Sequence, residues 1–440
     1  NVVCPFNTED FEDCLALASE DEMCIGTLDE IQKLHVRTVP LNEQPRRICH
    51  SEQYGAFAIV TNRFQVDEST NGEEIEMNYI RLMDEQTFDI VDSFTLDDFE
   101  QGISVTKCVF KGDETTEYFV VGTAYALEDE PEPSRGRILV FKVSSFDSTE
   151  SSNNNNSSTT TTTIITDDDS NNINVKRLEL VAQADTPGAV YTLKSFNGNL
   201  LAGVNSKIQL YEWSNTDEGV DVPKELNSKC GLHGHILALY LQTRGDFILV
   251  GDLMKSISLC VYKPLEGMIE EIARDFNANW MTAIGIIDDD TFIGAEHAFN
   301  LFVAKKNSTA TSEEERGRLE ITGEYHLGEF VNCFQDGSLV MQPMENIKGA
   351  GNNNKSSGSN SNSNSNSDIG NDNGSNSNSM DVDDDTDIST ASSMINIRPT
   401  MLFATVSGSI SALANLTKNQ FDLLHRLQNA LNKVINGVGG

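Results

Sequence analysis

Positive charge is scarce in this sequence. Its 440 residues hold 31 lysines and arginines against 68 aspartates and glutamates, which gives a formal net charge of −37. Sequence-independent binding to nucleic acid depends on basic side chains that displace counterions from the phosphates, so this balance excludes direct binding of that kind. Basic segments of other proteins suit such a surface better. Any association with nucleic acid, DNA included, is therefore expected to be indirect.

Paired cysteines and long apolar runs are also missing. The eight cysteines are scattered without a Cys-x-x-Cys pair. Several lie in strand-like segments, where a free cysteine acts as a small hydrophobe. This usage favours a reducing compartment over a disulfide framework. No stretch approaches the ~18 apolar residues of a membrane span, so we expect an intracellular protein without a membrane segment.

Motifs of catalysis and metal binding are few. The sequence has no Gly-x-Ser-x-Gly elbow, no phosphate loop and no His-Glu-x-x-His. The nearest approach to a metal cluster is Cys230, His233 and His235, which lack a fourth ligand. The run from Asp288 to Asp290 precedes a strand-like segment and is expected to form a solvated turn. We expect no enzyme activity, no metal and no cofactor.

A repeat dominates what is present. Seven segments consist of a short apolar strand, a glycine or another small residue, a few polar residues and a second, alternating strand. They are residues 23–36, 56–66, 118–143, 200–213, 248–262, 292–306 and 401–413. A period of about 40–50 residues built from strand hairpins is typical of β-propeller blades. A β-sandwich is the main competitor, but it does not require a repeat. The sequence therefore predicts an all-β propeller.

Two segments lack large apolar side chains. Residues from about 149 to 173 are rich in Asn, Ser and Thr, and residues from about 346 to 392 are rich in Asn, Ser and Gly and then acidic. Such segments cannot offset the entropy cost of ordering, so they are predicted to be disordered insertions.

The C-terminus has helical periodicity. Its apolar stripe consists of Phe421, Leu424, Leu427, Leu431 and Val434. Thr417 is the expected N-cap, and Asn436-Gly437 is the expected stop. The sequence predicts one amphipathic helix over residues 417–435.

A binding surface remains as the main functional possibility. In a propeller, the short connections at strand ends gather on one face around a central channel. Leu253, Met254, Lys255 and His297 occupy such connections, and Trp280 is one of two tryptophans. Exposed Trp and Met beside Lys are typical of protein-binding hot spots. The alternative that Trp280 and the tyrosines pack between blades stays open.

Several long motifs resemble those of one known family. They include EIQKLHVRTVPL (30–41), YFVVGTA (118–124), GDFILVGDLM (245–254), EEIARDFNANWM (270–281) and LNKVINGVG (431–439). In sequence and order they resemble the large subunit of the damage-specific DNA-binding protein, the adaptor of cullin-4 RING ubiquitin ligases. The resemblance covers almost the whole chain apart from the two insertions. The large subunits of the splicing factor 3b and polyadenylation-specificity complexes share the architecture and form the alternative.

The resemblance implies three seven-bladed, WD40-like propellers followed by a helical domain. It assigns residues 1–41 to the end of a preceding propeller, residues 42–416 to a seven-bladed propeller, and residues 417–440 to the start of the helical domain. The implied function is a non-catalytic scaffold whose third propeller forms half of the cleft for substrate receptors. The implied partners are WD-repeat receptors, including the damage-recognising small subunit, and cullin-4 through the preceding propeller. The implied role is DNA damage recognition and repair in the nucleus and cytoplasm.

Thirteen residues would face the receptor by this resemblance. They are Ala124, Glu130, Tyr191, Leu237, Leu239, Tyr240, Leu253, Lys255, Trp280, His297, Phe330, Asn332 and Cys333. Four depart from the family pattern: Lys255 stands where Arg is usual, His297 for Asn, Leu237 for Met and Cys333 for Val. Because Lys lacks the planar fork of Arg, a bidentate contact is not expected from Lys255.

Overall fold

The computed structural model describes residues 2–8, 11–18, 23–27, 38–66, 74–127, 129–147, 174–214, 224–337, 399–431 and 433. The two predicted insertions, at about 149–173 and 346–392, lie outside the described residues, as do Val434 and the expected helix stop at Asn436-Gly437. No helix in the described part of the chain is long and apolar enough to cross a membrane.

Six antiparallel sheets make up the main body, and each is a meander in chain order. Blade 1 contains β4 (Gln44–Ser51), β5 (Ala56–Val66), β6 (Glu74–Asp84) and β7 (Ile90–Thr95). Blade 2 contains β8 (Glu100–Phe110), β9 (Asp113–Tyr125), β10 (Gly136–Asp147) and β11 (Asn174–Thr186). Blade 3 contains β12 (Val190–Phe196), β13 (Asn199–Val204), β14 (Lys207–Ser214) and β15 (Glu225–His233).

Blades 4 to 6 continue the same pattern, except that the described residues of blade 6 form three strands. Blade 4 contains β16 (Ala238–Arg244), β17 (Phe247–Asp252), β18 (Ile257–Lys263) and β19 (Met268–Arg274). Blade 5 contains β20 (Met281–Ile286), β21 (Thr291–Glu296), β22 (Asn300–Lys306) and β23 (Leu319–His326), with the short helix α1 (Glu313–Arg316) before β23. Blade 6 contains β24 (Val331–Asp336), β25 (Pro399–Thr405) and β26 (Ile410–Ala414).

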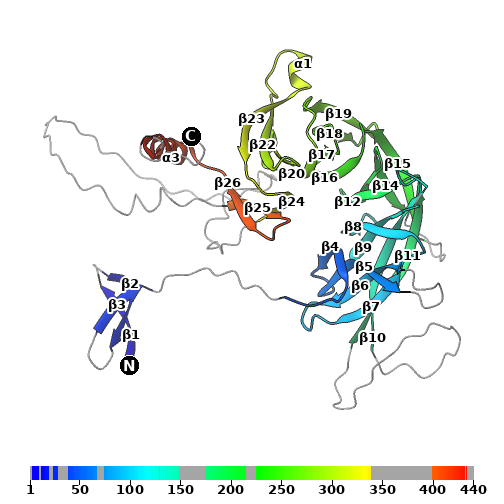
Figure 1. Cartoon of the computed structure of the whole chain (residues 1–440), viewed down its shortest axis with the longest axis horizontal. Helices are drawn as coiled ribbons and strands as arrows, with labels where there is room; N and C mark the ends of the chain where they lie inside the picture. Colours follow the sequence, from blue (N-terminus) through cyan, green and yellow to red (C-terminus); the bar gives the residue numbers. More distant parts are fainter. Residues whose placement is uncertain are drawn as a thin grey trace, which may run out of the picture. The chain divides into compact units, whose positions relative to one another are not determined.

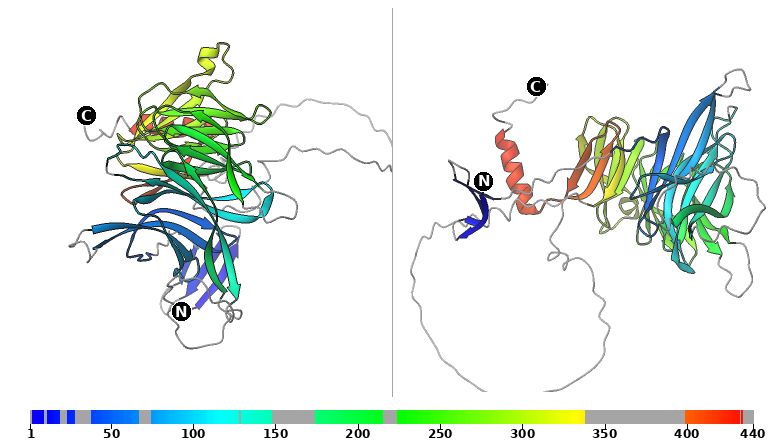
Figure 2. Two further views of the ribbon diagram at one scale, coloured as in Figure 1. Left: turned by 90° about the vertical axis from the view of Figure 1, so that its right-hand side faces the viewer. Right: turned by 90° about the horizontal axis from the view of Figure 1, so that it is seen from below.

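The six sheets are arranged as propeller blades. Their first strands contact one another in the order β4, β8, β12, β16, β20 and β24 and surround a centre (Figure 1). Apolar clusters lie between successive blades, for example Phe119 and Phe141 of blade 2 against Val60 and Ile80 of blade 1. Two further views show the blades from the side and from below (Figure 2). The predicted propeller is confirmed, but the described residues form six blades instead of the seven expected.

The small residue in each repeat has a packing reason. A Cβ on Gly122 would lie 2.5 Å from Val190 Cγ1, and a Cβ on Gly251 would lie 2.8 Å from Ile284 Cγ2. Gly203 would similarly meet the Ala238 carbonyl at 2.6 Å. In all three cases the obstacle belongs to the first strand of the next blade. Glycine therefore permits close approach of adjacent blades.

A β-bulge recurs near the start of every first strand. The pairing between the first and second strands shifts by one residue at Pro45/Arg47, Gly102/Ser104, Val190/Thr192, Ala238/Tyr240, Met281/Ala283 and Val331/Cys333. The residue inside each shift has no cross-strand partner. A bulge of this kind redirects a side chain out of the regular alternation of the strand.

Two parts lie outside the blades. A separate three-stranded sheet contains β1 (Val2–Thr8), β2 (Phe11–Ala18) and β3 (Met23–Thr27), and it belongs to a compact unit distinct from the one that holds the blades. Helix α3 (Lys418–Leu431) confirms the predicted C-terminal helix. Thr417 and Gln420 cap it reciprocally, because Gln420 N–H donates to Thr417 Oγ1 and Thr417 N–H donates to Gln420 Oε1.

Candidate protein-binding rim

One end of the propeller collects two kinds of connection. These are the loops between the second and third strands of a blade and the links from one blade to the next. We call this end the rim. Its described residues are 96–103, 124–127, 129–135, 187–191, 205–206, 234–240, 252–256, 275–282, 296–300, 327–333 and 405–409. All thirteen residues singled out in the sequence lie on it, because strand order in an antiparallel meander brings these ends together.

A single backbone hydrogen bond recurs around the rim. In five blades, a residue after the second strand donates its N–H to the carbonyl of the link that precedes the blade. The five bonds are Ala126 to Phe99, Asn205 to Ala189, Leu253 to Leu237, His297 to Trp280 and Val406 to Phe330, at 2.9–3.1 Å. Each of these blades therefore holds the backbone of the link residue that precedes its first strand. The rim is a set of equivalent positions instead of a set of independent loops.

The bulges explain why predicted residues occur in pairs along the chain. Tyr191, Leu239 and Asn332 are the unpaired residues within the bulges of β12, β16 and β24. All three are at least partly exposed. Leu237 and Phe330 lie two residues earlier, at the link position of the recurring hydrogen bond. In each of these blades, the residue at the link position and the residue two places later in the bulge therefore both lie at the rim.

The connection of blade 4 is organised by one buried carboxylate. Asp252 is 5 % exposed and accepts four backbone hydrogen bonds. The donors are the N–H groups of Ile236 and Leu237 at 2.8 and 3.1 Å, and those of Met254 and Lys255 at 3.0 Å each. One side chain therefore holds both rim segments of this blade, and Leu253 and Lys255 are positioned by it.

Ser256 completes this connection in a left-handed conformation. Its φ is 58°, which for a residue other than glycine costs on the order of 1 kcal/mol. The hydroxyl donates to Asp275 Oδ2 at 2.7 Å, and the N–H donates to the Asn279 carbonyl at 3.0 Å. These contacts offset the strain and link the loop of blade 4 to the segment that carries Trp280.

Aromatic side chains cluster on the next part of the rim. Trp280 is 43 % exposed, and its ring centroid lies 5.2 Å from that of His297. Phe299 and Phe330 form an edge-on pair with centroids 6.4 Å apart. Trp280 therefore lies on the surface, which decides against packing between blades for this residue.

The other tryptophan, Trp213, packs between two blades. Trp213 is 4 % exposed and stacks on Phe110, with ring centroids 4.5 Å apart and planes 7° from parallel. Tyr191 and Tyr240 are half-buried, and burial raises the pKa of both phenols. Both hydroxyls therefore remain neutral at physiological pH.

The remaining predicted residues differ in accessibility. Ala124 is 1 % exposed, so its side chain is not available on this surface. Glu130 accepts hydrogen bonds from the backbone and hydroxyl of Ser134 in the loop after β9. Lys255, His297, Asn332 and Cys333 are exposed.

Sequence reasoning missed several exposed apolar residues of the rim. They are Phe99, Leu127, Phe276, Phe299 and Val406. Phe99 occupies the same link position as Trp280 and Phe330, because its carbonyl accepts the recurring hydrogen bond. This shared position could have identified Phe99 as a rim residue. It can be recognised only after the blades are aligned by their hydrogen bonds.

A buried ion pair supports the blade 1–blade 2 part of the rim. Glu100 is fully buried and accepts from Arg137 Nε at 2.7 Å, from Arg137 Nη2 at 2.5 Å and from the Thr123 hydroxyl at 2.5 Å. The hydrogen bond to Glu100 raises the pKa of Arg137. Glu100 also accepts the N–H of Asp97 at 3.0 Å, so the pair fixes the segment that carries Phe99.

The metal-like triplet is dispersed in the structure. His235 Nε2 lies 3.2 Å from Glu271 Oε2, whereas Cys230 packs against the apolar cluster between blades 3 and 4. Within the described residues, no group of three or more His, Cys, Asp or Glu side chains is placed to hold a metal ion.

Comparison with known proteins gives the family. Residues 77–440 match the sequence profile of the CPSF A subunit region. The chain belongs to that family. Over its whole length it is 47 % identical to DNA damage-binding protein 1a of Arabidopsis thaliana, 44 % identical to DNA damage-binding protein 1 of Solanum lycopersicum and 44 % identical to DNA damage-binding protein 1 of Oryza sativa subsp. japonica. It spans 32–33 % of the length of these relatives.

Family membership agrees with the rim geometry. The resemblance noted in the sequence is confirmed, and the profile match covers every described link and loop of the rim from residue 96 onward. The positions named from the resemblance recur at equivalent places in several blades.

Proposed function

We propose that this chain is the receptor-binding part of a non-catalytic adaptor in a cullin-4 RING ubiquitin ligase that acts in DNA damage recognition and repair in the nucleus. The rim forms half of a cleft that binds WD-repeat substrate receptors. The observation that supports this most directly is the run of exposed apolar side chains on hydrogen-bonded links, with Trp280 and Phe330 as anchors. Rigid aromatic anchors give affinity at low entropy cost.

The rim suits a protein partner in its charge as well. Lys255 and His297 are exposed beside the aromatic cluster in a chain of net charge −37. Lys255 lies next to the Asp252-organised loop, so its backbone is fixed while its side chain is free to reach a partner. A cation on an otherwise acidic body provides a specific contact for a carboxylate or carbonyl of the receptor.

A second candidate is a scaffold in pre-mRNA processing. The family profile is named for the A subunit region of CPSF, so the same rim could hold subunits of a polyadenylation-specificity or splicing factor 3b complex. The two candidates predict different partners, so identification of the proteins that co-purify with the full-length protein distinguishes them.

The test uses the full-length protein with Trp280→Ala combined with Lys255→Glu. This double change removes the aromatic anchor and reverses the rim charge, so we expect WD-repeat receptors to be lost from affinity purifications while cullin-4 is retained. The matched control is Phe247→Ala with Lys111→Glu, an exposed aromatic and an exposed lysine at the opposite end of the blades. Unchanged receptor recovery with the rim variant would contradict the proposal, and recovery of processing subunits from the unaltered protein would favour the second candidate.

The domain organisation is proposed on the same basis. Residues 1–41 end a preceding propeller, residues 42–416 belong to a seven-bladed propeller, and residues 417–440 begin a helical domain. The support for a seventh blade comes from blade 6. Leu402, Ala404, Ile410 and Ala412 share the face that points away from blade 5, and Ile410 is 53 % exposed. Ala404 occupies the register position of Gly122, Gly203 and Gly251, each of which faces the next blade.

A further inference from the structure

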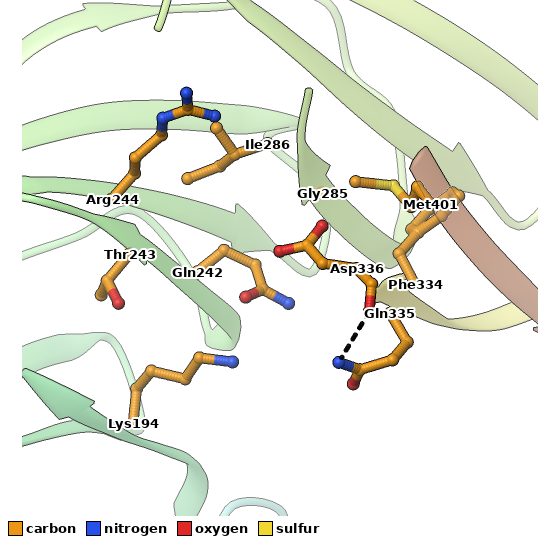
Figure 3. A pocket seen from close by; sticks show the side chains of 10 residues that line it. All are labelled: Lys194, Gln242, Thr243, Arg244, Gly285, Ile286, Phe334, Gln335, Asp336 and Met401. Carbon is orange, nitrogen blue, oxygen red and sulfur yellow. Dashed lines mark hydrogen bonds between the residues drawn. The ribbon is translucent and has the colours of Figure 1, made fainter. Parts of the chain in front are cut away.

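A polar cavity lies at the end of the channel opposite to the rim. Its volume is about 280 Å³, just below the range of about 300–1,000 Å³ that is usual for small-molecule sites. It is lined by the ends of the first strands of blades 3 to 6 and by Met401 of β25. Figure 3 shows the side chains that surround it. A site of this size admits one small metabolite.

Opposite charges face each other across this cavity without touching. The Lys194 ammonium comes from β12 and the Asp336 carboxylate from β24, and Figure 3 shows both turned toward the space between them. Within the described residues, no ion pair within 4.0 Å joins the two groups and neither side chain has a hydrogen-bond partner, although the Gln335 amide donates to the backbone carbonyl of Asp336 at 3.4 Å. Burial lowers the pKa of Lys194, while Asp336 is the largest of the charges that act against this shift.

The neutral polar side chains around this pair are also available. Gln242 and Thr243 line the cavity (Figure 3), and neither side chain makes a hydrogen bond to a described residue. Arg244 does not share this property, because its Nε lies 2.8 Å from Asp289 Oδ1 outside the cavity. The amide of Gln335 also lines the cavity. Lys194, Asp336, Gln242 and Thr243 are therefore the lining groups that a ligand would meet without an ion pair or side-chain hydrogen bond to another described residue, beside the paired Arg244.

We propose that this cavity binds a small zwitterion, a polar α-amino acid, with its carboxylate on Lys194 and its ammonium on Asp336. A simple anion would be repelled by Asp336 and a simple cation by Lys194, whereas a molecule that carries both charges satisfies both groups. Gln242 and Thr243 would accept and donate hydrogen bonds to the polar remainder. Because charge-assisted hydrogen bonds are about twice as strong as neutral ones, the two charged contacts determine selectivity.

The strand ends hold the charged pair apart. Lys194 lies just before the turn at Asn197-Gly198, which is tied to blade 2 by the hydrogen bond from Lys111 N–H to the Gly198 carbonyl. Asp336 pairs in register with Met401 of β25. The two side chains come from blades that are not adjacent, so the packing of the blades between them sets their separation. The site is independent of the proposed receptor surface, which lies at the other end of the blades.

The experiment measures binding of L-glutamine to the full-length protein by saturation-transfer NMR and calorimetry. Two matched probes each lack one charge: N-acetyl-L-glutamine has no ammonium, and L-glutamine amide has no carboxylate. We expect L-glutamine to bind and each blocked probe to bind at least about tenfold more weakly, because one charge-assisted contact is lost and one repulsion is gained. Absence of L-glutamine binding, or equal binding of either blocked probe, would overturn the proposal.

Variants assign the two charges. Lys194→Met should weaken L-glutamine binding at least about tenfold, and Asp336→Asn should do the same while reducing the discrimination against N-acetyl-L-glutamine. Lys255→Met at the rim is the control and should leave the affinity unchanged. Since the two blocked probes test the unaltered protein, a variant that fails to fold does not remove the test. Unchanged affinity in both folded variants would also contradict the assignment.

Discussion

At the residue scale, the two tryptophans show that position decides the role of a side chain. Trp213 lies on β14 and stacks on Phe110 between blades 2 and 3, whereas Trp280 occupies the link before β20 and is 43 % exposed. The same side chain therefore contributes to blade packing in one place and to the rim in the other. Composition alone could not separate them, because it does not say whether a residue lies on a strand inside the blades or on a link at the rim.

Trp213→Ala should destabilise the contact between blades 2 and 3 by about 3–5 kcal/mol, because it removes a large buried ring from a close-packed site. Trp280→Ala should change stability by less than about 0.5 kcal/mol, as for an exposed residue. The measurement is hydrogen exchange of β9 and β14. Trp213→Phe is the control and should retain most of the protection, since the indole N–H has no hydrogen-bond partner among the described residues. Equal effects of the two alanine changes would contradict this division.

Asp252→Ala should lower the free energy of opening of the blade 4 connection by about 2–3 kcal/mol, because four backbone N–H groups lose a charged acceptor. Asp252→Asn should lower the same free energy by less than Asp252→Ala does, since one carbonyl oxygen remains as an acceptor. The check is hydrogen exchange of residues 234–240 and 252–256. If Asp252→Ala also reduced receptor recovery while Lys255 was intact, the carboxylate would be a positioning residue for the rim. Full protection in the alanine variant would show that the loop is held by other contacts.

At the element scale, the hairpin repeat could be predicted from the sequence and the bulges could not. Periodic apolar strands with Gly122, Gly203 or Gly251 at fixed places predicted the blades, and the structure supplies the reason for those glycines. The bulge residues Tyr191 and Leu239 were named through resemblance alone. A one-residue shift in register leaves no mark in composition, because it is set by the pairing of two strands.

The C-terminal helix is another element that local sequence largely specifies. Its apolar spacing and the Thr417–Gln420 cap involve residues within one or two turns of each other. Such short-range interactions are readable from the sequence. Phe421 and Leu427 of α3 are exposed. Local sequence does not specify which element would pack against them.

At the scale of the whole molecule, the number of blades is where expectation and structure differ. Seven blades were expected and six are described, and the far face of blade 6 carries the apolar pairs Leu402–Ala412 and Ala404–Ile410. In the other blades, the corresponding face is covered by the next blade. A repeat count from sequence cannot supply this information, because ring closure depends on the tilt and packing of all blades together.

If a seventh blade covers blade 6 in the full-length protein, Ile410→Asp should reduce hydrogen-exchange protection of β24–β26 by about 2–4 kcal/mol, since a charge would be buried without a partner. Tyr325→Asp on β23 is the matched control, because Tyr325 is 65 % exposed on the last strand of blade 5. It should have an effect within about 0.5 kcal/mol. The same small effect from Ile410→Asp would show that this face remains in solvent.

The sequence by itself determined the propeller class, the position of the helix and the family, because these depend on periodicity, local capping and long matching motifs. The tertiary structure decided which side chains share a surface. It brought Leu237 to Leu253, Trp280 to His297 and Phe299 to Phe330. It also placed Lys194 across a cavity from Asp336, which is 142 residues later in the chain by their numbers. These juxtapositions follow from blade packing, and no local pattern encodes a distance between residues so far apart.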